Sequence, residues 1–299
     1  MLIDVAGGHI NVLLEGDGPL VLLVHGFPEG AWAWRHQLPA LAAAGFRAVA
    51  IDVRGYGDSF APAPVEAYRM LAHVADNVAV VRALGAETAV VIGHDWGSPI
   101  AAACAQVRPD MFTAFGMLGV PYTPRGETPP RFPEDFYVGH FQTPGVAEAE
   151  IQADVRGWLR RFFAALTDGT PGWFGVPMHL PDAPLPRWLA DAEFDAVAAA
   201  FERTGFAGPL NRYRNFARDW EDLAAFPDDP RQPAIFITGE RDSTRLWLGD
   251  AIDRQTEWLP GLAGVHVVPD CGHWVQQERP EQVNALLLEF LTDHPERVV

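Results

Sequence analysis

The sequence predicts an α/β fold, a mostly parallel sheet with helices on both faces and an inserted all-helical domain. Two patterns support this prediction. Short apolar runs alternate with helical patterns along the chain, and the runs are nearly continuous in hydrophobicity, as in parallel strands covered on both faces. The alternation stops over about residues 122–224, where Pro, Gly and aromatic residues are frequent and the patterns are helical.

The individual elements follow from the apolar runs and the prolines between them. The expected strands are 19–25, 47–53, 88–93, 113–119, 234–239 and 265–269. The expected helices are about 31–44, 68–84, 98–107, 246–258 and 280–293. Pro109 ends the third helix because proline cannot continue one, and Pro280 suits the first turn of the last helix. This alternation is typical of βαβ units.

The interruption divides the chain into a core, residues 1–121 and 225–299, and a cap, residues 122–224. Within the cap, apolar residues recur at helical spacing, and this stripe is interpreted as core packing. Its members are Ile151, Val155, Trp158, Leu159, Phe162 and Leu166. A helical insertion in a parallel α/β sheet is expected to cover the functional site.

Composition excludes several classes of protein. The 299 residues carry a formal net charge of −17, which repels nucleic acid and anionic membranes. No apolar run is long enough to span a membrane, and the N-terminus lacks a signal-peptide pattern. The two cysteines form no disulfide or zinc pattern. We therefore expect a cytoplasmic protein, monomer or homodimer, without metal or other cofactor.

The candidate nucleophile lies in T-A-V-V-I-G-H-D-W-G-S-P, residues 88–99. An apolar strand, a glycine-flanked polar residue and a small-residue helix form the pattern of a nucleophile elbow, in which the polar residue is usually serine. Here it is Asp95, between Gly93 and Gly97. The start of the following helix stabilises negative charge and keeps such a carboxylate ionised.

Three further parts of a catalytic site follow from chain order. An acid, Asp242, comes just after a strand in I-F-I-T-G-E-R-D, and His273 lies in the later loop P-D-C-G-H-W. The loop H-G-F-P-E-G, residues 25–30, is placed to aim the N–H of Phe27 at an oxyanion, with the N–H of Trp96 as second donor. His25 is expected to hydrogen-bond within its loop.

Taken together, H-G-F-P, R-G-Y-G-D-S (54–59), G-H-D-W-G and G-H-W resemble the α/β-hydrolase superfamily over nearly the whole chain. The resemblance implies the α/β-hydrolase fold, and the aspartate points to the epoxide hydrolase and dehalogenase branch. A carboxylate nucleophile supplies its own carbonyl, so its substrate must be an electrophilic alkyl carbon. Attack would form an ester, which His273, oriented by Asp242, would hydrolyse by activating water.

The cap segments F-Y-V-G-H-F-Q-T-P-G-V-A-E-A-E (136–150) and G-F-A-G-P-L-N-R-Y-R-N (205–215) resemble the epoxide hydrolase cap. There, two tyrosines protonate the epoxide oxygen, and the matching residues are Tyr137 and Tyr213. The resemblance implies a small-molecule epoxide substrate and a vicinal diol product. Phe27, Trp96 and Phe141 are expected to form pocket walls.

Two other readings remain open from the sequence. A haloalkane or haloacetate dehalogenase would use the same Asp95, although Phe27 and Trp96 stand where those families usually carry Asn and Arg. A non-catalytic relative that only binds ligands would not need the complete set of nucleophile, acid, histidine and tyrosines.

Overall fold

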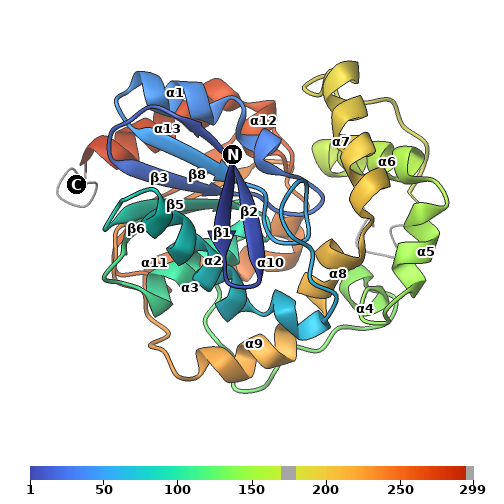
Figure 1. Cartoon of the computed structure of the whole chain (residues 1–299), viewed down its shortest axis with the longest axis horizontal. Coiled ribbons are helices and arrows are strands. Elements are labelled where there is room, and N and C mark those ends of the chain that lie inside the picture. The colour runs from blue at the N-terminus through green and yellow to red at the C-terminus, as the bar shows by residue number, and fades with distance from the viewer. Residues whose placement is uncertain (170–179, 294–299) are drawn as a thin grey trace.

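The computed structural model of the chain describes residues 1–169 and 180–293, and its centre is an eight-stranded sheet (Figure 1). The strand order is β1-β2-β4-β3-β5-β6-β7-β8. The strands are β1 (Leu2–Val5), β2 (Gly8–Glu15), β3 (Leu20–Val24), β4 (Arg47–Ile51), β5 (Ala89–His94), β6 (Phe112–Leu118), β7 (Ala234–Gly239) and β8 (Leu262–Val268). Strands β3 to β8 pair in parallel, whereas β1 and β2 form an antiparallel ribbon at one edge. The predicted α/β-hydrolase fold is confirmed.

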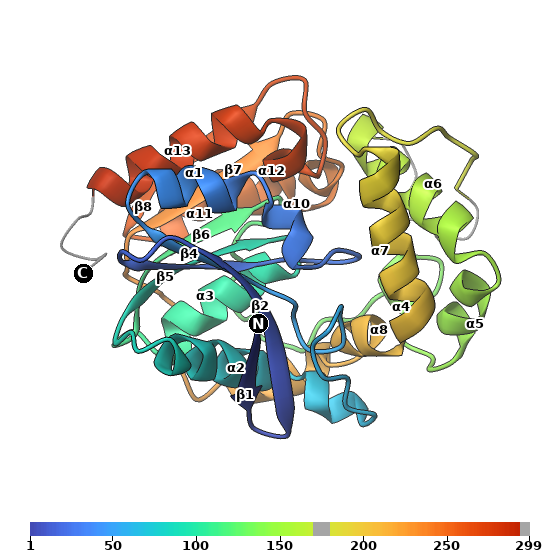
Figure 2. The same cartoon turned by 45° about the horizontal axis from the view of Figure 1, so that its top comes forward.

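Helices cover both faces of this sheet (Figure 2). One face carries α1 (Gln37–Ala43) and α13 (Pro280–Asp293), and the other carries α2 (Met70–Ala83) and α3 (Gly97–Val107). The remaining core helices are α10 (Thr244–Asp253), α11 (Gln255–Trp258) and α12 (Val275–Glu278). The expected helix 31–44 is split into a 3₁₀ helix, Ala31–Trp34, and α1. The expected helix 246–258 is interrupted at Leu248, where the backbone leaves helical geometry.

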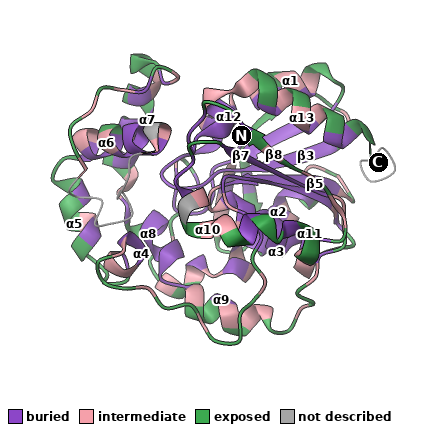
Figure 3. Cartoon of the chain, turned by 180° about the vertical axis from the view of Figure 1, so that it is seen from behind, coloured by how far each residue is buried: buried purple, intermediate pink, exposed green. Residues whose placement is uncertain are grey.

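Burial on both faces explains the continuous apolar runs. Side chains of β3 alternate between two hydrophobic clusters: Leu22 and Val24 belong to one, Val21 and Leu23 to the other. The central strands are buried throughout (Figure 3). Strand β8 differs from the prediction because it is an edge strand, and Val265 and Val267 remain 38% and 43% exposed.

The described part of residues 122–224 contains helices and no strand. They are α4 (Tyr137–His140), α5 (Val146–Gln152), α6 (Val155–Asp168), α7 (Asp191–Thr204), α8 (Ala207–Tyr213) and α9 (Phe216–Leu223). Helices α4 to α8 lie together at one end of the sheet (Figures 1 and 2). The predicted apolar stripe on α5 and α6 is buried, as core packing requires. Residues 170–179 of the expected cap lie outside the described residues.

The helices of the described ranges include none that is both long and apolar enough to cross a membrane.

Candidate active site

Asp95 lies on the tight turn between β5 and α3 with a positive φ of 51°, which is uncommon for a residue with a side chain. The Asp95 N–H donates to the carbonyl of Leu118 at 3.0 Å, and the Ser98 N–H donates to the carbonyl of Asp95 at 3.0 Å. A Cβ on Gly97 would overlap the carbonyl of Val24, so only glycine fits directly behind the turn. The turn therefore presents the carboxylate beyond the end of the sheet.

Tertiary folding brings the predicted acid and histidine to this carboxylate. His273 Nε2 lies 3.5 Å from Asp95 Oδ2, and His273 Nδ1 lies 3.1 Å from both carboxylate oxygens of Asp242. Asp242 follows β7, and its Oδ1 also accepts the N–H of Thr244 at 2.9 Å. The imidazole is thus held between the buried carboxylate of Asp242 and the partly exposed carboxylate of Asp95.

The electrostatics of this trio follow from that arrangement. Burial by itself would lower the pKa of His273, but Asp242 and Asp95 raise it well above its ordinary value. Burial would likewise raise the pKa of each carboxyl, yet both values lie below the usual range because His273 pairs with each of them. The two carboxylates therefore favour the protonated form of the ring between them.

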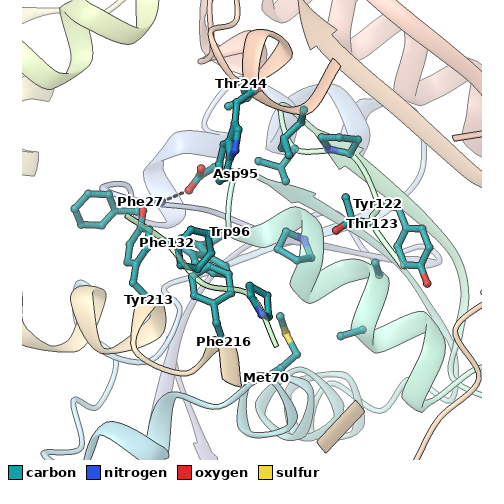
Figure 4. Close-up of a pocket in the computed structure, with 18 of the residues that line it drawn as sticks. Phe27, Met70, Asp95, Trp96, Tyr122, Thr123, Phe132, Tyr213, Phe216 and Thr244 are labelled. Atoms are coloured by element: carbon teal, nitrogen blue, oxygen red, sulfur yellow. Dashed lines mark hydrogen bonds between the residues drawn. The ribbon is translucent and has the colours of Figure 1, made fainter. Parts of the chain in front are cut away.

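The other oxygen of Asp95 faces the H-G-F-P loop. The N–H of Phe27 donates to Asp95 Oδ1 at 2.7 Å, the contact drawn as a dashed line in Figure 4. Gly26 lets the loop come this close, since a Cβ there would overlap the Asp95 side chain. Trp96 has helical backbone angles and directly precedes α3, so its N–H is one of the amides without a partner in the helix ladder.

Tyr137 and Tyr213 come from α4 and α8 and meet over the nucleophile. Their ring centroids are 5.9 Å apart, and Tyr213 also packs edge-on against Phe27 and Trp96. Burial and the nearby Asp95 raise the pKa of Tyr137, and burial, Tyr137 and Asp95 raise the pKa of Tyr213. Both phenols therefore keep their protons over the whole neutral range.

These groups line one apolar cavity of about 300 Å³. Phe27, Asp95, Trp96, Tyr213 and Met70 can be located in Figure 4. Its wall also includes Tyr137, Phe132, Phe162, Leu166, Phe216, Leu223, Trp247 and His273.

The expectation for Phe141 as a pocket wall is wrong. This residue is fully buried and does not belong to the cavity lining. Its ring packs at 5.7 Å from Tyr137, 5.1 Å from Tyr213 and 6.0 Å from Phe27. The segment was predicted correctly, but Phe141 directly follows α4, and its side chain packs against the two tyrosines outside the cavity lining.

The expected role of His25 within its loop is confirmed. Its Nε2 accepts the N–H of Val53 at 2.9 Å, while Nδ1 donates to the carbonyl of Gly26 at 2.8 Å. Burial lowers the pKa of His25, in agreement with a neutral ring that has one donor and one acceptor.

Sequence reasoning missed two buried residues beneath the site. Glu29 accepts the N–H of Gly26 at 3.2 Å and shares a 2.8 Å hydrogen bond with His94 Nδ1. The other nitrogen of His94 donates to the carbonyl of His273 at 2.9 Å. The pair thus connects the H-G-F-P loop with the histidine loop. A signal for this contact was present in the sequence: Glu29 and His94 lie close to Phe27 and Asp95 in apolar segments, and charged residues in such surroundings are rarely unpaired.

Over residues 1–169 and 180–293, no three His, Cys, Asp or Glu side chains gather as a ligand set for a metal ion.

Comparison with known proteins places this geometry in a family. The family described as "alpha/beta hydrolase fold" matches residues 19–280. Epoxide hydrolase B of Mycobacterium tuberculosis is 39% identical, over 93% of this chain and 92% of its own length. Epoxide hydrolase A of the same organism is 40% identical, over 97% and 96%.

Solved structures agree with these relatives. An epoxide hydrolase from an endophytic Streptomyces superposes with a TM-score of 0.94 at 55% identity, over 99% of this chain and 95% of that one. The chain therefore belongs to the α/β hydrolase fold family and, within it, to the epoxide hydrolases.

Proposed function

We propose that this enzyme converts an epoxide and water to a vicinal diol through an ester on Asp95. Oδ2 is the attacking oxygen, because Oδ1 is held by the N–H of Phe27. Attack of Oδ2 on an epoxide carbon breaks its C–O bond and leaves the electron pair on the epoxide oxygen. Oδ1 becomes the carbonyl oxygen of the ester and already lies in its hydrogen bond.

Tyr137 and Tyr213 are the proton donors for the opened ring. An alkoxide would be costly in this apolar cavity, so a proton must reach the oxygen as the C–O bond breaks. Two phenols with raised pKa values are both protonated, and both line the same cavity as Asp95.

His273 becomes a base only after the ester has formed. In the free enzyme, two carboxylates keep its pKa high and its ring protonated. Esterification removes the charge of Asp95, and the imidazolium loses one of its two partners. The phenolate that remains after ring opening accepts the proton that His273 gives up, which restores the phenol. The neutral His273 ring can then take a proton from water, with Asp242 fixing the ring through Nδ1.

Hydrolysis completes the cycle at the carbonyl carbon of the ester. The activated water attacks that carbon, and the negative charge collects on Oδ1, where the N–H of Phe27 and that of Trp96 stabilise it. The bond between that carbon and Oδ2 then breaks. Oδ2 leaves in the diol, and the oxygen of the water stays in Asp95.

The single observation that best supports this function is the aspartate with two phenols facing it in one apolar cavity. A halide leaving group needs N–H donors and no proton, so a dehalogenase gains nothing from two protonated tyrosines. A protein that only binds ligands has no use for an imidazole held at 3.5 Å and 3.1 Å from two carboxylates.

Single turnover in ¹⁸O water tests the mechanism. With enzyme in excess over styrene oxide, the heavy oxygen should enter the peptide that contains Asp95, and the diol should keep ¹⁶O. Label that appears directly in the diol would contradict the ester. Halide release from 1-chlorobutane, with epoxides left intact, would instead establish the dehalogenase.

We also propose that residues 122–224 form a cap inserted between the core segments 1–121 and 225–299. We further propose a cytoplasmic location, which cell fractionation tests, and a monomeric or homodimeric state, which light scattering tests. The substrate class is a small epoxide able to enter an apolar cavity of about 300 Å³.

A further inference from the structure

The two phenols belong to segments that are far apart in the sequence, and a small set of polar contacts joins these segments. Tyr137 begins α4, and Tyr213 ends α8. The side chain of Gln142 lies between them, and its Nε2 donates to the carbonyl of Val138 at 2.8 Å and to the carbonyl of Tyr213 at 2.9 Å. One amide group therefore ties both tyrosine segments together.

Arg214, directly after Tyr213, makes the same connection from the other side. Its Nε donates to the carbonyl of Phe141 at 2.8 Å, and Nη2 reaches the carbonyl of Thr143 at 3.3 Å. The guanidinium also holds Glu148 on α5 in a two-pronged ion pair, Nη1–Oε1 at 2.6 Å and Nη2–Oε2 at 3.0 Å. The Arg214 side chain is only 4% exposed and that of Glu148 is 18% exposed, so the guanidinium is buried and its carboxylate partner is partly buried.

Glu148 in turn fixes the turn that precedes α5. Its Oε2 accepts the N–H of Gly145 at 2.9 Å. Burial would raise the pKa of Glu148, but the hydrogen bonds from Arg214 hold it below the usual range, so the carboxylate is charged at neutral pH. None of Gln142, Glu148 and Arg214 lines the cavity.

We propose that Arg214, Glu148 and Gln142 are positioning residues for epoxide opening, which set the placement of the Tyr137 phenol relative to the Tyr213 phenol. The inference rests on the proposed function of the two tyrosines. Its physical reason is that both phenols must reach one oxygen atom, and misplacement by about 1 Å can cost about a hundredfold in rate. Ester hydrolysis uses His273 and water, so it does not depend on the relative placement of the two phenol groups.

The test separates the two chemical steps. Quenched-flow mass spectrometry with styrene oxide follows formation of the Asp95 ester and its later hydrolysis in the same sample. Arg214→Lys keeps the charge but loses the two-pronged geometry. We expect it to slow ester formation about ten- to a hundredfold, with ester hydrolysis changed less than about threefold.

Arg54→Lys is the matched control. Arg54 is also buried and also holds a carboxylate with two prongs, Nε–Oδ2 and Nη2–Oδ1 of Asp76, both at 2.7 Å, but in the core. A loss of stability alone should therefore appear in both variants, whereas the selective loss of ester formation should appear only in Arg214→Lys.

Gln142 is exposed, so Gln142→Met should fold and repeat the selective effect in weaker form.

A double-mutant comparison distinguishes positioning from general support. In a Tyr213→Phe background only one phenol remains, so adding Arg214→Lys should cost clearly less than it does in the wild type. Equal loss in both backgrounds, or equal slowing of both steps, would overturn this inference while leaving the epoxide hydrolase intact. A wild-type enzyme that forms no Asp95 ester with styrene oxide or 1,2-epoxyhexane would overturn the proposed function instead.

Discussion

At the scale of single residues, the site depends on how one imidazole is shared. His273 faces Asp95 through Nε2 and Asp242 through Nδ1, and these carboxylates keep its pKa high although the ring is buried. A protonated histidine cannot act as a base, so the first step has to change the charge of its surroundings. In the proposed mechanism, esterification of Asp95 removes one of the two negative charges beside His273, so ring deprotonation follows ester formation.

His273→Gln should separate these steps. The nucleophile and the phenols are intact, so the ester should form, but hydrolysis should slow by about 10²–10⁴-fold without its base. Intact-protein mass spectrometry after mixing with styrene oxide should show one stable adduct for each chain. Normal diol turnover by this variant would contradict the role of His273.

Glu278 predicts a pH effect on stability. Its carboxylate accepts the N–H of Gly272 at 2.9 Å and the N–H of Trp274 at 3.1 Å, on either side of His273, and burial raises its pKa to about 7. The folded state therefore holds this proton more tightly than the unfolded chain, whose carboxyl titrates near 4.5. Its stabilising contribution is complete at low pH and is lost as pH rises to about 7.

Glu278→Gln removes this titration. The free energy of unfolding of the variant relative to the wild type should rise by about 1–3 kcal/mol between pH 4.5 and pH 8, since one pKa unit corresponds to about 1.4 kcal/mol. Urea unfolding at several pH values measures it. A difference that stays constant over this range would show that Glu278 does not titrate there.

At the scale of elements, the site combines residues from the sheet with two tyrosines from short helices. The sheet ends and their loops supply Asp95, Asp242 and His273, whereas α4 and α8 supply the phenols. Helix ends are suitable for this purpose, because a side chain on the first or last turn can point away from the helix axis into a cavity. In the proposed mechanism, this division separates nucleophilic attack by a sheet residue from proton donation by the inserted helices.

This division predicts the behaviour of the tyrosine variants. Tyr137→Phe and Tyr213→Phe should each slow ester formation by about tenfold or more, and the double variant by about 10²–10⁴-fold, since no proton donor remains. Stopped-flow tryptophan fluorescence with styrene oxide measures the rate, because Trp96 lines the cavity. Tyr68→Phe, a buried tyrosine outside the cavity lining, is the control.

At the scale of the whole molecule, arginine side chains connect the helices of residues 122–224 to the sheet domain. Arg35, just after the 3₁₀ helix, donates from Nε to Glu193 on α7 at 2.6 Å and from Nη1 to Gln277 on α12 at 2.6 Å. Arg69 pairs with Asp222 on α9. These contacts join helices of residues 122–224 to segments of the sheet domain at two separate places.

Arg35→Ala should loosen this attachment. We expect the free energy of unfolding to fall by about 1–2 kcal/mol, and amide hydrogen exchange to increase in α7 more than in the core strands. Arg231→Ala is the control, since Arg231 is exposed and pairs only locally with Asp229. Uniform exchange changes over cap and core would show that Arg35 has no special part in fastening the cap.

The amino-acid sequence is sufficient to predict the parallel sheet, the helical insertion, the candidate nucleophile and the family. These are local properties: a buried strand needs a continuous apolar run, and the turn at Asp95 needs glycine where a Cβ would meet Val24. Chain order then predicted Asp242 and His273, and the resemblance of two segments to the epoxide hydrolase cap predicted Tyr137 and Tyr213.

The contacts between these groups, in contrast, are visible only in the tertiary structure. It shows that Oδ1 of Asp95 accepts the N–H of Phe27 and that Phe141 packs against Tyr137. It also shows the buried contact of Glu29 with His94. It also showed Arg214 spanning two distant segments. Hydrogen bonds of this kind depend on distances within a few tenths of an ångström between segments far apart in the chain, and no local pattern records them.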